Sequence, residues 1–326
     1  LGNFHYDVNK TKQFWKRIEM FGGKSLMNQP DEYKNCSLCP RDCHADRHLR
    51  KGYCQCSHKL TAARAALHHW KEPCISGTHG SGTIFFTGCT LRCCFCQNYS
   101  ISSQGFGKEI TDQRLSEIFL ELQDAGAHNI NLVTATQYLP SILPALDRVK
   151  SRLHIPIVYN CGGYEKQETL ARLNGYVDIY LPDLKYYDPA LSMRYSMASD
   201  YFSVASKAIH YMIKQKGAPE FDDKGLLKKG VIIRHMVLPG CRKDSIRLLH
   251  WIKENLTDNH YLISLLSQFT PFYKSCEHPE INRRITTYAY ESVLNEALRL
   301  GLTDGYMQEK SSAKEEYTPP FDLDGI

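Results

Sequence analysis

The sequence contains no run of 18 apolar residues, so it lacks the hydrophobic stretch with which an α-helix spans a bilayer. Its first residues also lack the charged and apolar regions of a secretory signal peptide. We therefore expect a cytoplasmic protein without a membrane partner. Because the chain does not begin with methionine, its natural N-terminus could lie upstream.

A strong excess of one charge is absent as well. The formal net charge is +5, from 40 basic and 35 acidic residues. Basic side chains do gather near the N-terminus, but few aromatic residues lie among them to stack on bases. We interpret this group as a solvated face that offsets thiolate charge, and we expect no nucleic-acid partner; it comprises Arg41, Arg47, Arg50, Lys51, Lys59, Arg64, Lys71 and five histidines, His44, His48, His58, His68 and His69.

Cysteine, in contrast, is abundant and unevenly placed. Ten of the 13 cysteines lie between Cys36 and Cys96, and none lies between Cys96 and Cys161. In a chain without a secretion signal, cysteines indicate metal or redox ligands rather than disulfides. Oxygen-labile metal chemistry in a reducing cytoplasm is the expectation.

The run Gly88-Cys-Thr-Leu-Arg-Cys-Cys-Phe-Cys-Gln-Asn98 has the spacing C-x3-C-x2-C at Cys89, Cys93 and Cys96. Three thiolates can hold three irons of a cubane cluster that normally takes four cysteines, which leaves one iron open for a small molecule. A structural zinc site usually needs a second C-x2-C pair, and none follows. Cys94 matches no ligand position and is expected to pack.

From about residue 82 the chain alternates strands with helices. Six such repeats predict a parallel sheet, and six units fit a partial (β/α)6 barrel whose ligands lie at the carboxyl ends of its strands. We assign this core to residues 81–310, followed by a polar tail over 311–326. The expected strands are 83–87, 129–134, 155–160, 177–181, 231–238, 261–266 and 305–308, and the expected helices are 111–126, 141–150, 165–173, 200–216, 244–255 and 286–300.

Residues 1–80 do not share the repeat and form a predicted cysteine-rich extension. Cys36, Cys39, Cys43 and Cys54 have the spacing C-x2-C-x3-C-x10-C, which can enclose one metal centre. The spacing is compatible with an auxiliary iron–sulfur cluster and with a structural zinc that staples a segment with little core of its own. Cys56 is expected to be a bystander.

Together these features resemble the radical S-adenosylmethionine (radical SAM) superfamily, and within it the proteins similar to the pyruvate formate-lyase activating enzyme. That resemblance implies a 4Fe–4S cluster on Cys89, Cys93 and Cys96, reductive cleavage of SAM to a 5′-deoxyadenosyl radical, and an external electron donor such as flavodoxin or ferredoxin. It rests on the ordered motifs at residues 36–43, 80–89, 96–98, 131–137, 159–165, 178–185, 234–240 and 263–271.

The resemblance also implies which residues contact SAM. Residues 134–137, Thr-Ala-Thr-Gln, stand where activating enzymes have a Gly-Gly-Glu-like stretch, and hydroxyls replace the carboxylate there. Since side chains alternate along a strand, Arg234 and His235 cannot both face the cavity, and we favour His235. The expected SAM-contacting residues are Phe95, Asn98, Thr134, Thr136, Asn160, Gly162, Gly163, Asp183, Lys185 and His235.

The sequence motifs do not identify the substrate. A glycine Cα–H of a partner enzyme, a peptide and a small metabolite are all candidate hydrogen donors. The ferredoxin-like insert of many glycyl-radical activases is missing, because no cysteine lies between Cys96 and Cys161. A protein of another class, a zinc- or iron–sulfur-containing nucleic-acid-binding or scaffold protein without turnover, is the alternative.

Overall fold

The computed structural model describes residues 31–308 and 318–326. Its centre is a mixed sheet with the strand order β10-β9-β8-β6-β5-β4-β2-β1-β3, and the short strand β7 (Glu220–Phe221) pairs with β8. The neighbouring strands from β2 to β10 in this order are parallel. These strands are β2 (Ser81–Phe86), β4 (Ile130–Val133), β5 (Ile157–Cys161), β6 (Ile179–Pro182), β8 (Leu227–Met236), β9 (Leu262–Leu266) and β10 (Gly305–Met307).

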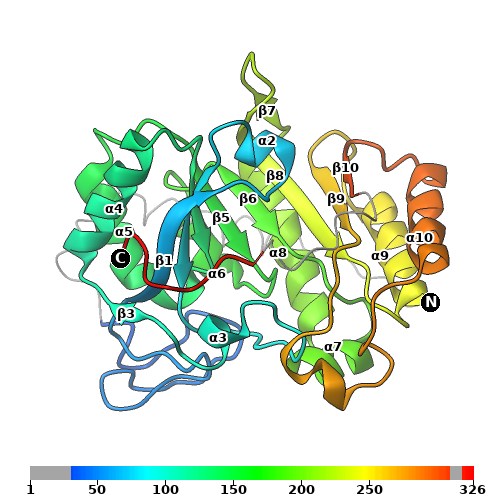
Figure 1. Ribbon diagram of the computed structural model, residues 1–326, viewed down its shortest axis with the longest axis horizontal. Helices are drawn as coiled ribbons and strands as arrows, with labels where there is room; N and C mark the ends of the chain where they lie inside the picture. The colour runs from blue at the N-terminus through cyan, green and yellow to red at the C-terminus, as the bar shows by residue number, and fades with distance from the viewer. Residues whose placement is uncertain (1–30, 309–317) are drawn as a thin grey trace, which may run out of the picture.

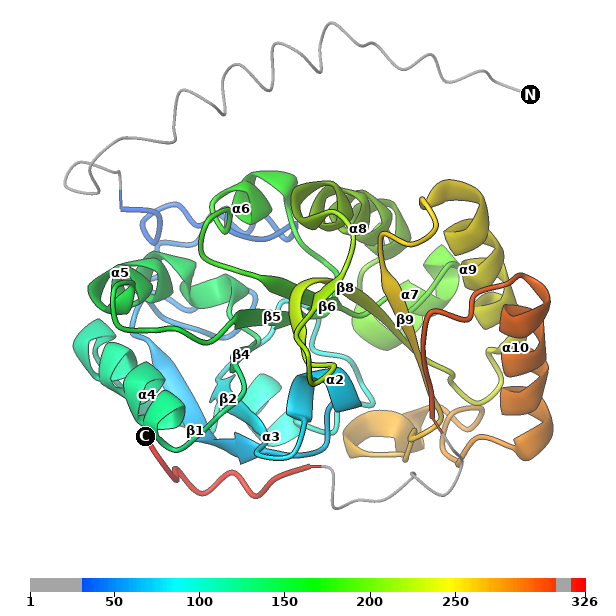
Figure 2. The same ribbon diagram turned by 90° about the horizontal axis from the view of Figure 1, so that it is seen from above.

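Helices follow the parallel strands, as the alternating sequence pattern predicts, so the α/β class with a parallel sheet is confirmed. Figure 2 shows most of them along the outer side of the curved sheet. Closure of the sheet as a (β/α)6 partial barrel stays a prediction. The helices are α4 (Asp112–Asp124), α5 (Leu139–Val149), α6 (Gln167–Ala171), α7 (Pro189–Ser196), α8 (Tyr201–Lys216), α9 (Arg242–Asn255) and α10 (Thr287–Arg299).

Side-chain caps explain where two of these helices begin. Thr111 precedes α4, and its hydroxyl accepts a hydrogen bond from the backbone N–H of Arg114 at 3.0 Å. Thr286 does the same for α10, accepting from the N–H of Ala289 at 3.2 Å. Such a cap satisfies a backbone donor that would otherwise have no partner in the first turn. The helix α4 then packs on β2 and β4, whereas α10 packs against α9.

The sheet extends N-terminal to residue 81, where the sequence predicted the extension to end. β1 (Thr61–His68) pairs antiparallel with β2, and β3 (Lys108–Glu109) pairs with β1 at the edge. A short helix, α2 (Pro73–Ser76), joins β1 to β2. Residues 61–68 therefore belong to the sheet. Residues 31–59 form a segment without helix or strand, which Figure 1 shows as blue loops below β3.

The described part of the C-terminal tail lies along β1. The N–H of Leu323 donates to the carbonyl of Ala63, and the N–H of Ala65 donates to the carbonyl of Asp324. Phe321 meets Phe85 edge to face at a centroid distance of 5.4 Å. Residues 1–30 of the predicted extension lie outside the described residues, and so do residues 309–317, where the predicted core meets the predicted tail. Within the described ranges, every helix is too short or too polar to span a membrane.

Candidate active site

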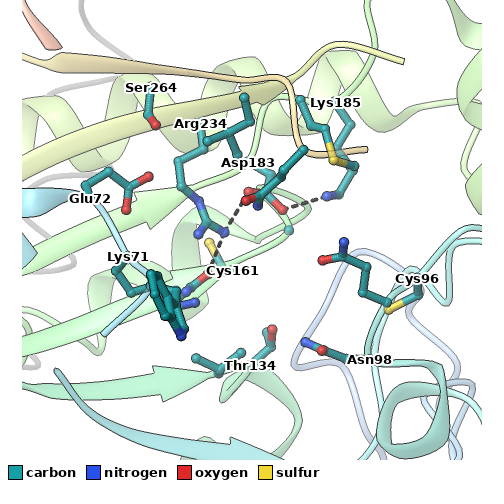
Figure 3. Close-up of a pocket in the computed structure, with 18 of the residues that line it drawn as sticks. Lys71, Glu72, Cys96, Asn98, Thr134, Cys161, Asp183, Lys185, Arg234 and Ser264 are labelled. Carbon is teal, nitrogen blue, oxygen red and sulfur yellow. Dashed lines mark hydrogen bonds and ion pairs between the residues drawn. The ribbon is translucent and has the colours of Figure 1, made fainter. Parts of the chain in front are cut away.

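A cavity of about 650 Å³ lies at the carboxyl ends of the parallel strands, within the size range of ligand pockets. Its wall is drawn from the cysteine loop after β2, from the ends of β4, β5 and β6, from β8 and β9, and from the segment between β1 and α2. Figure 3 shows these groups converging from opposite sides of the space. The cavity therefore gathers residues that are more than 200 positions apart in the sequence, from His68 to Gln308.

Three thiols of the cysteine loop line this cavity: Cys89, Cys93 and Cys96. Hydroxyl groups support two of them, since Ser196 Oγ donates to Cys93 Sγ at 2.9 Å and Ser102 Oγ donates to Cys96 Sγ at 3.3 Å. The backbone N–H of Leu91 lies 3.4 Å from Cys89 Sγ. Donors aimed at sulfur stabilise the thiolate, which is the form that binds metal.

Cys94 is separated from this set. It is absent from the cavity wall, and its backbone bonds to neighbouring loops, with its N–H donating to the carbonyl of Tyr195 and its carbonyl accepting from the N–H of Lys274. Between Cys94 and Cys96, the ring of Phe95 lines the cavity and packs edge to face on Phe269 at 5.7 Å. Of residues 93–96, Cys94 alone thus lies outside the cavity wall.

Asp183 forms the centre of a charged network in the opposite wall. Its Oδ1 accepts from Arg234 Nη2 at 2.7 Å, and its Oδ2 accepts from Lys185 Nζ at 2.5 Å (Figure 3). Burial opposes ionisation of Asp183, but the two cations outweigh it and hold the pKa of the carboxyl below its ordinary value. Two cations and one anion leave a net positive wall, which suits a ligand carboxylate.

Two buried donors of this wall have no hydrogen-bond partner within the described residues. They are Nδ2 of Asn160 and Nε of Arg234. Asn160 Oδ1 already accepts from Arg234 Nη2 at 2.8 Å, so the side chains are held in place while a donor of each stays unused. Because buried polar groups are normally paired, such donors indicate a missing acceptor, and both residues line the cavity.

Residues 134–137, which replace the Gly-Gly-Glu-like stretch, have different surroundings. Thr134 lines the cavity, whereas the Thr136 hydroxyl lies 3.0 Å from both carboxylate oxygens of the buried Glu165. Burial raises the pKa of Glu165 to about 8. Gln137 Nε2 donates to the carbonyls of Thr87 and Gly88, just before the cysteine loop. Thr136 therefore lies outside the expected contact surface.

The two glycines after β5 also differ. Gly162 lines the cavity, and a β-carbon there would lie 2.7 Å from Leu91 of the cysteine loop. Gly163 lies outside the cavity wall with φ +78°, and a β-carbon would lie 2.1 Å from the carbonyl oxygen of Asp183. Gly163 is thus required for the packing of β5 against β6 rather than for an approach of a ligand.

The structure places Arg234, and not His235, in the cavity wall. His235 is buried on the other side of β8, where Nδ1 lies 2.7 Å from the carbonyl oxygen of Leu184. Burial lowers the pKa of His235 to about 4, so the ring is neutral near pH 7. The prediction that His235 faces the cavity is therefore wrong. The two side chains do point to opposite sides of the strand, but Arg234 is the one that faces the cavity.

The remaining expected contact residues, Asn98 and Asn160 among them, line the cavity. Sequence reasoning missed the wall that lies between β1 and α2, where Lys71 and Glu72 face the space (Figure 3). Burial, followed by the charge of Arg234, lowers the pKa of Lys71 to about 8. No motif signals these residues, because only the antiparallel pairing of β1 brings them to the cavity.

The profile of the Radical SAM superfamily matches residues 83–255, the segment that carries the cysteine loop and Asp183. The chain belongs to the radical SAM superfamily. An uncharacterized protein of Methanocaldococcus jannaschii, MJ0674, is 31% identical over 282 residues, which cover 83% of this chain and 76% of that protein. The superfamily implies a 4Fe–4S cluster and SAM as cofactors.

Two solved structures resemble the chain distantly. Streptococcus suis SuiB, crystallised with S-adenosylmethionine, gives a TM-score of 0.46 at 14% identity and covers 68% of this chain. The hydrogenase maturase HydG of Carboxydothermus hydrogenoformans gives a TM-score of 0.47 at 12% identity and covers 95%. The chain spans 48% of SuiB and 68% of HydG, so it is shorter than both.

The residues of the cavity fit the two cofactors. Three supported thiols on one loop supply the donor set for a cluster with one open iron. Facing them, the unused donors of Asn160 and Arg234 and the positive wall around Asp183 suit a carboxylate such as that of SAM. Cys89, Cys93 and Cys96 would hold the cluster, and Asn160, Lys185 and Arg234 would hold SAM.

Proposed function

We propose that this protein uses SAM and a 4Fe–4S cluster to remove a hydrogen atom from a substrate, and that the substrate is a glycine Cα–H of a partner protein. The observation that carries the proposal is the meeting, in one cavity, of the thiol loop and the Asp183 network. The ordered motifs similar to those of the pyruvate formate-lyase activating enzyme support the choice of a glycyl-radical partner. The electron donor would be an external flavodoxin or ferredoxin.

When bound, the cluster would supply the electron that cleaves the SAM sulfonium, and the 5′-deoxyadenosyl radical would take the substrate hydrogen. The chain's own residues prepare this site. Ser102, Ser196 and the N–H of Leu91 hold the three thiolates. Lys185 and Arg234 fix Asp183 and leave positive charge for the methionyl carboxylate. The apolar ring of Phe95, 4% exposed, keeps water from the reacting atoms.

The Lys71 ammonium lies on the substrate side of this account. It forms no ion pair within the described residues, and it faces the same cavity from a different element than the SAM-binding groups. A cation there would bind a negative group of the substrate, such as a carboxylate near the target glycine. Lys71→Met should then lower the rate of hydrogen abstraction from the substrate. The affinity for SAM should stay within about twofold of the parent, which is about 0.4 kcal/mol of binding free energy.

The proposed function is tested by trapping the hydrogen. Reconstituted protein, dithionite and SAM are incubated with extracts in which glycine carries deuterium at Cα, and the 5′-deoxyadenosine formed is analysed by mass spectrometry. Deuterium in 5′-deoxyadenosine, together with a glycyl-radical doublet in the EPR spectrum, supports the activase. Deuterium transfer from a peptide or small metabolite, without a protein radical, would contradict the proposed activase function. It would indicate radical modification of that peptide or metabolite instead.

A further inference from the structure

We propose that Cys36, Cys39, Cys43 and Cys54 hold a second iron–sulfur cluster, built into a segment that braces the catalytic cysteine loop. The proposal goes beyond the function proposed above, because it concerns a metal centre outside the active-site cavity. None of the four cysteines lines that cavity. All four are free thiols, and three of them are buried: Cys36, Cys39 and Cys54.

The segment 31–59 contains no helix or strand. Its own apolar cluster is very small: Tyr33, Cys36 and Leu38, with Cys43 packed against them. Short segments with so little core usually need a cross-link or a metal to stay folded. Since the described cysteines form no disulfide, a metal is the remaining cross-link.

Contacts link Cys43 both to Cys54 and to Cys36. Cys43 Sγ and Cys54 Sγ are 3.4 Å and 3.6 Å from the position that a β-carbon on Gly52 would occupy. Cys43 also packs against the small apolar cluster that contains Cys36. The absent side chain at Gly52 leaves room beside two sulfurs that any larger residue would fill.

Backbone hydrogen bonds hold the first three of these cysteines close together. The N–H of His44 donates to the carbonyl of Cys36 at 3.0 Å, and the N–H of Cys36 donates to the carbonyl of Ala45 at 3.1 Å. The N–H of Asp42 donates to the carbonyl of Cys39 at 3.1 Å. The backbone over residues 36–45 thus folds back on itself, which brings its two ends, with Cys36 and Cys43, side by side.

A buried cation gives independent support. Arg47 is 1% exposed, and its Nη1 lies 3.8 Å from Cys36 Sγ. Its guanidinium donates to the carbonyls of Gln137 and Ser57, its Nε has no partner, and no carboxylate pairs with it within the described residues. A buried charge needs an opposite charge nearby. Metal-bound thiolates at Cys36 and Cys54 would provide it.

The placement of the side chains favours a cluster over a single zinc ion. One tetrahedral zinc with 2.3 Å bonds brings its four sulfurs within about 3.8 Å of one another. Within the described residues no three His, Cys, Asp or Glu side chains are placed to hold one metal ion. The same is true of Cys89, Cys93 and Cys96, for which the superfamily implies a cluster. A cluster binds each thiolate through a different iron, so it accepts wider spacing.

The segment also touches the catalytic loop directly. Cys56 Sγ donates to the carbonyl of Thr87 at 3.3 Å, and Arg41 Nε donates to the carbonyl of Thr90 at 2.9 Å. Arg47 reaches the same loop through Gln137, whose amide holds the carbonyls of Thr87 and Gly88. A metal centre that fixes residues 36–54 would therefore fix the backbone on both sides of Cys89.

Metal analysis of a variant without the catalytic thiols tests the proposal. Full-length Cys89→Ala/Cys93→Ala/Cys96→Ala protein is reconstituted anaerobically with iron and sulfide, and iron, sulfide and zinc are counted alongside a Mössbauer spectrum. We expect about four irons and four sulfides per chain in this variant, and about eight irons in the parent. One zinc per chain, or no bound metal, in the folded triple variant would overturn the proposal.

A second step assigns the ligands. Adding Cys36→Ser and Cys54→Ser to the triple variant should remove the remaining iron, whereas adding Cys276→Ser, an exposed cysteine far from the segment in sequence, should leave it unchanged. Iron retained in the first combination would contradict the assignment. These readouts need neither SAM nor turnover, so they stand whether or not the proposed hydrogen abstraction is correct.

Discussion

At the scale of single residues, the cavity is governed by how its charges are paired. Asp183 is held by Arg234 and Lys185, and the wall retains one positive charge for a ligand. If these cations bind SAM, removing one should cost a charge-assisted contact. If they only stabilise the strand end, SAM affinity should not change.

We therefore expect Lys185→Met to weaken SAM binding tenfold to 150-fold, since a lost charge-assisted hydrogen bond costs about 1.5–3 kcal/mol. Iron content should stay at the parental level, because Lys185 bonds to Asp183 and not to the thiols. Anaerobic calorimetry measures the affinity. Lys229→Met, which removes an exposed ion pair with Glu220, is the matched control and should leave it unchanged.

Glu165 makes a separate prediction about pH. Burial raises the pKa of its carboxyl from 4.5 to about 8. Between these values the folded chain keeps a proton that the unfolded chain releases, so the free energy of unfolding contributed by Glu165 falls as pH rises, by about 1.4 kcal/mol per unit at most. Below pH 4.5 the full contribution of Glu165 to the free energy of unfolding is present, and above about pH 8 it is lost.

Glu165→Gln removes this titration. Its free energy of unfolding should therefore decline less than that of the parent between pH 5 and pH 8 in urea titrations. The exposed Glu168→Gln variant in α6 serves as the control and should follow the parent. Parallel pH profiles for Glu165→Gln and the parent would show that Glu165 titrates alike in both states.

At the scale of elements, the join between β2 and the cysteine loop is the tightest point. Gly88 has φ +85°, and a β-carbon there would lie 2.0 Å from Cys56 Sγ and 2.7 Å from the carbonyl oxygen of Cys54. Only glycine lets the N-terminal segment approach the catalytic loop this closely. The contact ties the segment 31–59 to the active site.

Gly88→Ala should therefore lower thermal stability and cluster retention together. Gly175→Ala is the matched control, because Gly175 has φ +82° with open space around its would-be β-carbon. Both variants carry left-handed strain, but only Gly88→Ala adds overlap worth about 1–3 kcal/mol. Equal losses of stability in differential scanning calorimetry, with iron content unchanged, would mean that the segment yields without moving the loop.

Strand β1 shows where element prediction failed. Residues 61–68 read Thr-Ala-Ala-Arg-Ala-Ala-Leu-His, which has little of the β-branched or aromatic content typical of strands. Pairing with β2 and with the C-terminal residues 323–324 supplies the order instead. Because that support is tertiary, no local pattern signals it, and the cavity residues Lys71 and Glu72 were missed with it.

At the scale of the whole molecule, the parallel sheet was predictable because each strand–helix repeat carries a local pattern. The carboxyl ends of the strands then locate the cavity, so Asn160 and Asp183 could be anticipated from their positions. Which side of β8 faces the cavity could not be predicted. Alternation along a strand states that one of Arg234 and His235 points inward, but the pairing of β8 with its neighbours decides which one. Gly163 and Thr136 likewise serve packing that sequence does not show.

The central claim is that Cys89, Cys93 and Cys96 carry a cluster that cleaves SAM in this cavity. The most direct measurement is 5′-deoxyadenosine formed by reconstituted, dithionite-reduced protein, compared with each single Cys→Ala variant in the loop. The account predicts product from the parent and from Cys94→Ala, and none above background from the other three. Product from Cys93→Ala with none from Cys94→Ala, or no product from an iron-loaded parent, would contradict it.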